Sequence, residues 1–190
     1  MILWACGIVV IKLTAKPEPD EIQPPVVQNQ RNAQEVFLQC RKDAEAGSKE
    51  AQYELSVIYA LGSGAERDKA KSAEWCQKAA ESGHPDAQLD IGHKYHTGNN
   101  GTTEPDYAKA LEWYKKAASS GHPNANFRAG TMYLYGEGVA KDYSQALEYF
   151  QQGAALGCPM SKSSLGWMYK YGKGVEKDEV KAAFWYNSIH

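Results

Sequence analysis

Small and apolar residues recur along this chain with two periods, one within each predicted helix and one between helices. An alanine or serine is followed by an apolar residue four positions later and by a tyrosine eight positions later. Residues spaced in this way lie on one side of a helix. The pattern starts at Ala51, Ala87, Ala125 and Ser161, so it returns after 36, 38 and 36 residues. This interval predicts a solenoid of stacked helix pairs.

Each predicted first helix ends in a glycine-rich turn, because glycine adopts the positive φ angles with which a chain leaves a helix. The turns lie at 62–64, 98–101, 136–138 and 172–174. One position inside the helix carries Gly92, Gly130 and Gly166, with Ser56 in the first copy. A glycine inside a helix lowers helix stability by roughly 1 kcal/mol relative to alanine. Its recurrence at the same position in three copies therefore predicts close approach by a neighbouring backbone.

A predicted second helix follows each turn and opens on an aspartate, seven residues before a large aromatic residue. A carboxylate here accepts hydrogen bonds from the first-turn amides, so we interpret these residues as N-caps and not as catalytic groups. They are Asp68, Asp106, Asp142 and Asp178. The second helices stop at Gly83, Gly121 and Gly157, each two residues before a proline that suits the next first turn. His84 and His122 precede two of these prolines and are predicted to cap helices.

These residues together resemble the Sel1-like repeat, a relative of the tetratricopeptide repeat with a longer turn. Residues 136–142 and 172–178, which read Gly-x-Gly-Val-x-Lys-Asp, carry the resemblance almost letter for letter, and it covers about residues 33–190. It implies an all-α fold, a right-handed α-solenoid of stacked helix-turn-helix repeats. We place the units near 51–86, 87–124, 125–160 and 161–190, with a degenerate half-unit at 33–50.

Two departures from the repeat lie near its ends. The first copy lacks the valine that follows the turn glycines, and the last copy stops at His190, before the Ala-Ala-x2-Gly ending of the others. Phe184, Trp185 and Tyr186 are expected to pack back on the first helix of their unit. The outward side of the last helix is expected to lack a cap, although terminal repeats normally carry a polar outer face.

Residues 1–32 differ from the repeats and are predicted to form an apolar leader and an extended linker. The apolar run ends at Leu13, too short to cross a bilayer as a helix, but it suits the apolar part of a secretory signal. Leu3-Trp4-Ala5-Cys6 also resembles a lipoprotein box, in which Cys6 would take the lipid. We expect export to the periplasm or envelope, with membrane contact only through this segment. The alternative is a cytoplasmic protein with an apolar tail.

Composition and motifs argue against nucleic-acid binding and catalysis. The net charge is −2 and no basic stripe or arginine-rich run appears, so we expect no nucleic-acid partner. No nucleophile elbow, P-loop or zinc-protease motif occurs, so we expect neither an enzyme nor a cofactor. His93 and His96 share a helix face and could offer two metal ligands, but the spacing supplies no third, so we expect no metal.

The cysteines do not follow the pattern of the cysteine-rich branch of the family, which carries two per unit. Cys40 and Cys76 occupy equivalent places in consecutive units. Neighbouring helix axes lie roughly 8–10 Å apart, farther than the separation of about 7 Å that a disulfide allows between Cα atoms, so we expect free thiols. The resemblance leaves one alternative function, a hydrolase or β-lactam-binding protein like those cysteine-rich relatives.

The positions at which the copies disagree are the candidates for a binding surface. At about 100° per residue, the sixth and ninth residues after the leading alanine project away from the second helix, and the third lies along the edge. The resemblance places these first helices on the concave face. The candidate contacts are Val57, His93, His96, Arg128, Thr131, Leu134, Trp167 and Lys170. Alternatively, these residues differ because nothing constrains them.

This surface predicts a non-catalytic scaffold that grips another protein or a peptide. Trp167 favours the binding interpretation, because large exposed aromatic side chains are common anchors in protein interfaces. The resemblance implies three kinds of scaffold: adaptors of envelope complexes, proteins that engage host cells, and immunity proteins that neutralise secreted toxic lipases. The leader and the short solenoid suit the immunity role, with a secreted toxin or an envelope component as partner.

Overall fold

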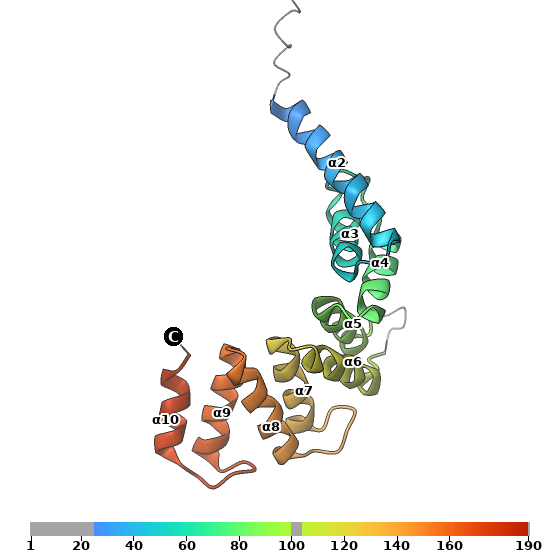
Figure 1. The fold of residues 1–190 in the computed structure, drawn as a ribbon. Helices are drawn as coiled ribbons and strands as arrows, with labels where there is room; N and C mark the ends of the chain where they lie inside the picture. The colour runs from blue at the N-terminus through green and yellow to red at the C-terminus, as the bar shows by residue number, and fades with distance from the viewer. Residues whose placement is uncertain (1–24, 100–103, 190) are drawn as a thin grey trace, which may run out of the picture.

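A computed structural model describes residues 25–99 and 104–189 of the chain. Within these ranges the chain forms helices and no strand. The helices are α2 (Pro25–Glu45), α3 (Lys49–Leu61), α4 (Lys69–Glu81), α5 (Pro85–Thr97), α6 (Tyr107–Ser119), α7 (Pro123–Tyr135), α8 (Tyr143–Ala155), α9 (Pro159–Tyr171) and α10 (Glu179–Asn187). They follow one another along an arc, with α2 at one end and α10 at the other (Figure 1). The predicted leader, including lipidation of Cys6, lies outside the described residues.

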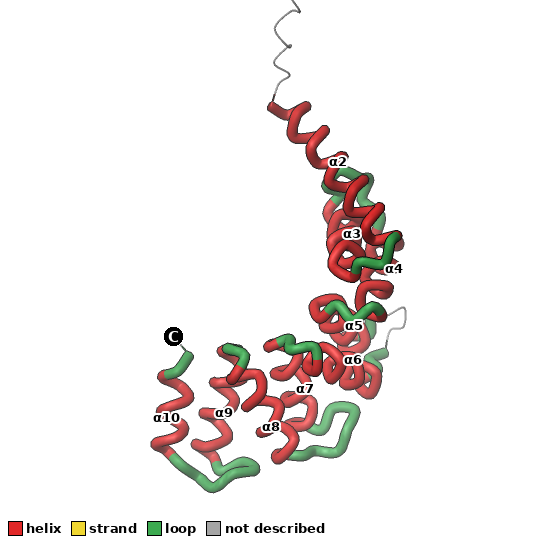
Figure 2. The backbone as a smooth tube through the Cα atoms, viewed as in Figure 1, coloured by secondary structure: helices red, strands yellow, loops and turns green. Residues whose placement is uncertain are grey.

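Consecutive helices pack in pairs, and the pairs stack. The pairs are α3–α4, α5–α6, α7–α8 and α9–α10, and each second helix that has a following pair also packs on the first helix of that pair. α2 packs on α3 in the same way, as the second helix of an incomplete leading pair. Short loops join the helices at both ends of the pairs (Figure 2). The predicted all-α solenoid of stacked helix pairs is confirmed.

The predicted capping residues hold the helix ends. Asp68 Oδ1 accepts hydrogen bonds from the amides of Ala70 and Lys71, both at 3.0 Å. The equivalent aspartates cap α6, α8 and α10 in the same manner. The glycines that follow α4, α6 and α8 have φ angles between 81° and 87°, the left-handed conformation that ends a helix.

Histidine caps two of the turns between units, and a cysteine stands at the third. His84 Nδ1 and His122 Nδ1 each accept a hydrogen bond from a first-turn amide at 3.4 Å. Because His122 Nδ1 accepts, its Nε2 carries the proton and donates to Asp86 Oδ1 of the previous unit at 3.0 Å. Cys158, in the equivalent place before α9, makes no capping bond with its side chain.

The glycines inside the first helices make room for rings of the second helices. A Cβ atom added to Gly130 would lie 2.7 Å from the ring of Phe150 on α8. The corresponding pairs are Gly92 with Tyr114 and Gly166 with Tyr186. The predicted close approach is confirmed, but the prediction of a neighbouring backbone is wrong, because an aromatic side chain fills the space.

α2 begins at Pro25, although the sequence predicts an extended linker as far as residue 32. Proline is tolerated in the first turn of a helix, where its missing N–H would have no partner. Residues 26–45 contain no further proline, and the glutamines and arginines among them favour helix. At 21 residues α2 is longer than the 13-residue helix α3. None of the helices described is both long and apolar enough to cross a bilayer.

The buried side chains form small separate clusters up to α5 and one large cluster from α6 onward. From α6 to α9 the buried side chains form one continuous cluster, which includes Tyr114, Met132, Phe150, Leu165 and Met168. Two smaller clusters precede it, one between α2 and α3 and one centred on α4 and α5. Cys40 and Cys76 stand in these smaller clusters at the position where α6 and α8 carry Tyr114 and Phe150. Both cysteines are free, as predicted.

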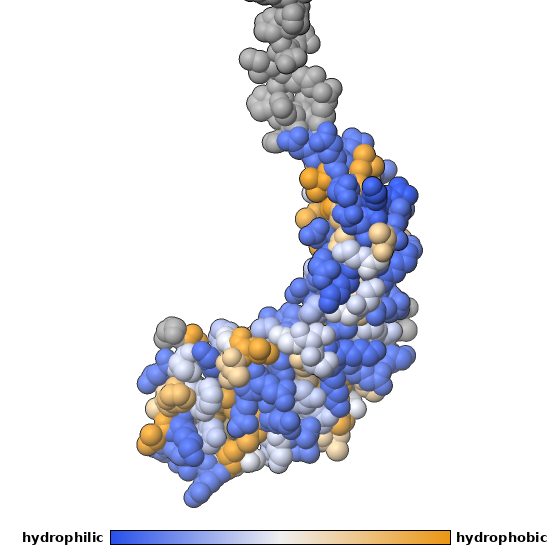
Figure 3. Space-filling model, in the orientation of Figure 1, coloured by the Kyte–Doolittle hydropathy of each residue, from blue (hydrophilic) through white to orange (hydrophobic). Residues whose placement is uncertain are grey.

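The aromatic residues of α10 divide between interior and surface. Trp185 packs against the large cluster and Tyr186 covers Gly166, as predicted. The prediction is wrong for Phe184, which remains 63% exposed, and Val180, one turn earlier, is 81% exposed. Apolar surface is visible over the α9–α10 end of the molecule and again beside α2 and α3, whereas the middle of the arc is mostly polar in this view (Figure 3).

Candidate functional site

The first helices line the inner side of the arc, and their exposed residues form the surface that we call the inner face. α7 contacts α9 directly, whereas no two second helices among the described residues contact each other to the same extent. The closer approach of these two first helices bends this part of the stack toward them. The inner face therefore consists of exposed side chains on α3, α5, α7 and α9.

Six of the predicted contacts lie on the inner face with accessible surface. Val57 is 40% exposed, and the side chain of Trp167 packs partly on the large cluster, with its ring centroid 5.6 Å from that of Tyr171. His93, Arg128 and Thr131 are half-buried, and Lys170 is exposed.

Two predicted contacts are engaged elsewhere. Leu134 is only 7% exposed and belongs to the large cluster, so it offers almost no surface to a partner. The helical wheel leaves this position open, but α9 packs directly against α7, which the wheel does not represent. His96 Nε2 lies 3.1 Å from Glu137 Oε2 of the next unit, and its ring packs edge-on against Tyr107. His96 therefore joins two units.

A second row of apolar residues extends the inner face, and the sequence prediction omits it. Leu61, Tyr135 and Tyr171 are 70%, 62% and 54% exposed. Each stands four residues after a predicted contact and directly before a turn glycine. The signal is present in the sequence, since residues four apart share a helix face and three of the four units carry a large apolar residue there.

A pocket of about 380 Å³ opens on the inner face between α3 and α5. Val57 and Ala60 line it from α3, and Asp90 and His93 line it from α5. Cys76 of α4, which is buried, lines it from beneath, because α4 packs against both first helices. The pocket therefore joins predicted contacts of two units to a residue of the helix between them.

Burial sets the protonation of the groups around this pocket. It raises the pKa of the Cys76 thiol and lowers the pKa of the His93 imidazole, so both are neutral at pH 7. Tyr53 Oη donates to Asp90 Oδ2 at 3.1 Å, and burial, followed by this carboxylate, raises the pKa of Tyr53. The Asp90 carboxylate and the Lys94 ammonium are the charges at its rim. A neutral thiol is a poor nucleophile, so these surroundings suit binding.

His93 and His96 share one neighbour and differ in another. Both rings lie near Tyr114, with centroids 5.6 Å away for His93 and 6.3 Å away for His96, but His96 Nε2 also turns to Glu137. Across residues 25–99 and 104–189, no group of three His, Cys, Asp or Glu side chains is placed to hold a metal ion.

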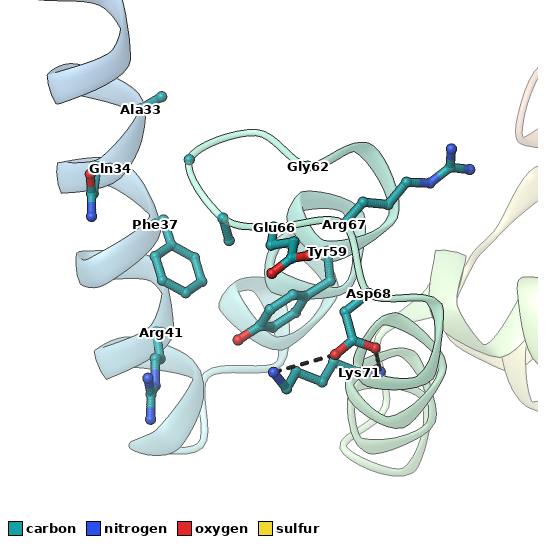
Figure 4. A pocket seen from close by; sticks show the side chains of 12 residues that line it. Ala33, Gln34, Phe37, Arg41, Tyr59, Gly62, Glu66, Arg67, Asp68 and Lys71 are labelled. Carbon is teal, nitrogen blue, oxygen red and sulfur yellow. Dashed lines mark hydrogen bonds and ion pairs between the residues drawn. The ribbon is translucent and has the colours of Figure 1, made fainter.

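A larger cavity of about 840 Å³ lies between α2 and the turn after α3 (Figure 4). The Lys71 ammonium lies 5.4 Å from the Tyr59 ring centre at its edge. The same arrangement recurs around Tyr169 in the last unit, with a volume of about 400 Å³. The cavity of the first unit is larger because it also extends along α2, where Ala33, Gln34, Phe37 and Arg41 line it. This recurrence marks the cavity as a feature of repeat packing, so we place the candidate site on the inner face.

Four segments of the chain match the Sel1 repeat, at residues 49–84, 85–122, 123–158 and 159–188. The chain belongs to the Sel1 repeat family. Each Sel1 repeat begins at the first residue of a first helix, two residues before the alanine or serine that opens the sequence pattern. No curated protein sequence matches the chain.

Solved Sel1 repeat structures share this fold. A Sel1 repeat protein from Oxalobacter formigenes is 31% identical with a TM-score of 0.73, and the match covers 98% of this chain and 80% of that one. A protective antigen of uropathogenic Escherichia coli is 35% identical with a TM-score of 0.72, over 80% of this chain and 32% of the antigen. This chain thus spans about a third of the antigen's length. An immunity protein from Pseudomonas aeruginosa, 24% identical with a TM-score of 0.51 over 94% of this chain and 68% of its own, shares the fold.

Proposed function

We propose that this Sel1 repeat protein is a non-catalytic scaffold that binds another protein or a peptide on its inner face. The observation that carries the proposal is the apolar surface of the inner face, with exposed Val57 and Leu61 on α3, Tyr135 on α7 and Tyr171 on α9, and with Trp167 partly buried beside Tyr171. Exposed apolar side chains that gather on one concave surface mark interaction sites. Rigid aromatic rings are favoured anchors in such sites.

Two features support binding over catalysis. Burial raises the pKa of the Cys40 and Cys76 thiols, which suppresses the reactive thiolate. The inner-face histidine at the pocket, His93, packs on Tyr114 instead of facing a hydroxyl or thiol in a hydrogen bond. The alternative, a hydrolase or β-lactam-binding protein, predicts turnover or capture of a reporter β-lactam above the buffer rate, and such a signal would reverse this ranking.

A finer proposal concerns the place and partner of the scaffold. We propose export to the periplasm or envelope, on the strength of the apolar leader and Cys6, and a role as an immunity protein that neutralises a secreted toxic effector. The Pseudomonas immunity protein shares the fold of this chain. The support for an immunity role of this chain is its apolar leader. A toxin gene beside the gene for this chain, and protection of cells that carry both, would support it. An isolated gene that gives no protection would contradict it.

The scaffold proposal is tested by panning a displayed library of random dodecapeptides against the immobilised full chain. Trp167→Ala with Tyr171→Ala should reduce capture of the enriched peptides by more than about tenfold, because two anchors are lost. Phe184→Ala is the matched control, since this ring is exposed but lies on a second helix. Capture that survives in the folded double variant, or that falls equally in the control, would show that the inner face is not the site.

A further inference from the structure

The pocket between α3 and α5 exists because the first unit carries small residues where the later units carry a ring. Cys76 holds the position of Tyr114 on α6 and Phe150 on α8, both of which are almost fully buried. Opposite Cys76 stands Ser56, in place of the glycine that makes room for the ring in the other three units. Both Ser56 and Cys76 line the pocket. The framework that seats an aromatic ring elsewhere is present here without one.

Charge divides the inner face into two parts. The first helices α3 and α5 carry four carboxylates, Glu50, Glu54, Asp86 and Asp90, against two lysines. The first helices α7 and α9 carry no carboxylate and three cations, Arg128, Lys162 and Lys170. A segment lying along this face therefore meets negative charge beside the pocket and positive charge beyond it. Complementary charge of this kind orients a partner and suppresses the reverse orientation.

We propose that the pocket receives an aromatic side chain of a basic protein segment, with the ring seated over Cys76 and Val57 and its cationic neighbours beside Asp90. This inference rests on the proposed function and names the chemistry of the partner. Asp90 is exposed at the rim and already accepts from Tyr53, which holds it in place. Lys94 stands on the same rim, where its ammonium repels cationic residues of the partner and so favours their placement beside Asp90.

The test uses the peptides that the random dodecapeptide library yields against the full chain. The inference expects these peptides to combine an aromatic residue with arginine or lysine, and to lose affinity as ionic strength rises. Synthetic copies are then titrated by fluorescence anisotropy against two variants. Ser56→Gly with Cys76→Tyr installs the pair that Gly92 and Tyr114 form in the next unit, and should fill the pocket and weaken binding more than about tenfold.

The second variant, Asp90→Asn, keeps the exposed side chain and its shape, so folding is secure even if the filled variant fails to fold. It should weaken binding by about two- to fivefold, the loss of affinity expected when a partly exposed ion pair is removed. Glu112→Gln is the matched control, because it also removes one exposed carboxylate but does so on the second helix α6, away from the inner face. An unchanged affinity in that control is expected.

The outcomes separate the inference from the function on which it rests. Peptides that depend on Trp167 but are acidic or uncharged, or that bind the filled pocket as well as the native one, overturn the inference and leave the scaffold intact. Failure to enrich any peptide, or enrichment that ignores the inner-face variants, overturns both. Basic aromatic peptides that lose affinity in both pocket variants support both.

Discussion

Across the second helices α6, α8 and α10 an aromatic ring lies against a glycine of the neighbouring first helix, whereas in α4 the corresponding residues are Cys76 and Ser56. The rings of α6 and α8, Tyr114 and Phe150, belong to one continuous interior from α6 to α9, and Cys40 and Cys76 belong to two small clusters in α2 to α5. We call α2–α5 the N-terminal region and α6–α10 the C-terminal region. The same repeat thus builds a filled stack in one region and an open pocket in the other.

This difference shows how a repeat protein can assign stability to one region and ligand binding to another. Each unit of a solenoid is stabilised mainly by its own packing and by its neighbours, so a large cluster in one region can hold the fold while another region leaves space for a ligand. The N-terminal region also carries the carboxylates of the inner face, and the C-terminal region its exposed aromatic rings.

The largest expected effect on stability comes from removing the buried ring of α8. Phe150→Ala removes a side chain with no exposed surface and should cost about 3–5 kcal/mol of unfolding free energy. Cys76→Ala in the N-terminal region removes only one heavy atom beside an existing pocket and should cost about 1 kcal/mol or less. Urea unfolding followed by circular dichroism measures both. Equal losses would remove the distinction between the two regions.

The next effect concerns the glycine that faces this ring. Gly130→Ala should destabilise the protein by about 1–3 kcal/mol, because the new Cβ would lie 2.7 Å from Phe150 and overpacks a filled core. Taken alone, alanine in a helix interior is favoured over glycine by roughly 1 kcal/mol, so the sign of the effect is informative. Ser56→Ala, at the equivalent place beside the pocket, should change stability by less than about 1 kcal/mol. A stabilised Gly130→Ala variant would contradict the packing described here.

Much of this architecture follows from local sequence chemistry, and the exceptions depend on distant neighbours. Asp68 and His122 could be predicted as caps because a cap acts within its own turn. The burial of Leu134 could not, because it results from the approach of α9 to α7. The pocket could not be predicted either, since the small size of Cys76 matters only beside Ser56 of another helix.

A smaller effect is expected at the junction of the two regions. His122→Ala removes the acceptor for a first-turn amide of α7 and the donor to Asp86, and should cost about 0.5–2 kcal/mol, as for other N-caps. Cys158→Ala, at a turn within the C-terminal region, removes no capping bond and should cost less. Thermal unfolding of the two variants compares them. A larger loss for Cys158→Ala would mean that the histidine does not link the regions.

The smallest expected effect is a response to pH confined to the N-terminal region. Burial lowers the pKa of His84 and His93 below the ordinary value of 6.5. The unfolded chain therefore binds more protons than the folded one between that value and the lowered pKa, so stability is full above pH 6.5 and falls as the pH drops through this window. Protonation of His84 Nδ1 also removes the acceptor that caps α5.

Hydrogen exchange read by mass spectrometry at pH 7.5 and 5.5, corrected for intrinsic rates, locates this loss. Protection should fall in α3 to α5 and change little in α8 and α9, which contain no histidine. Replacement of the two side chains by neutral analogues, His84→Asn and His93→Gln, should abolish the change, since asparagine retains a capping acceptor. An equal loss in both regions, or one that persists in the double variant, would show that acid acts on the shared framework of the repeat.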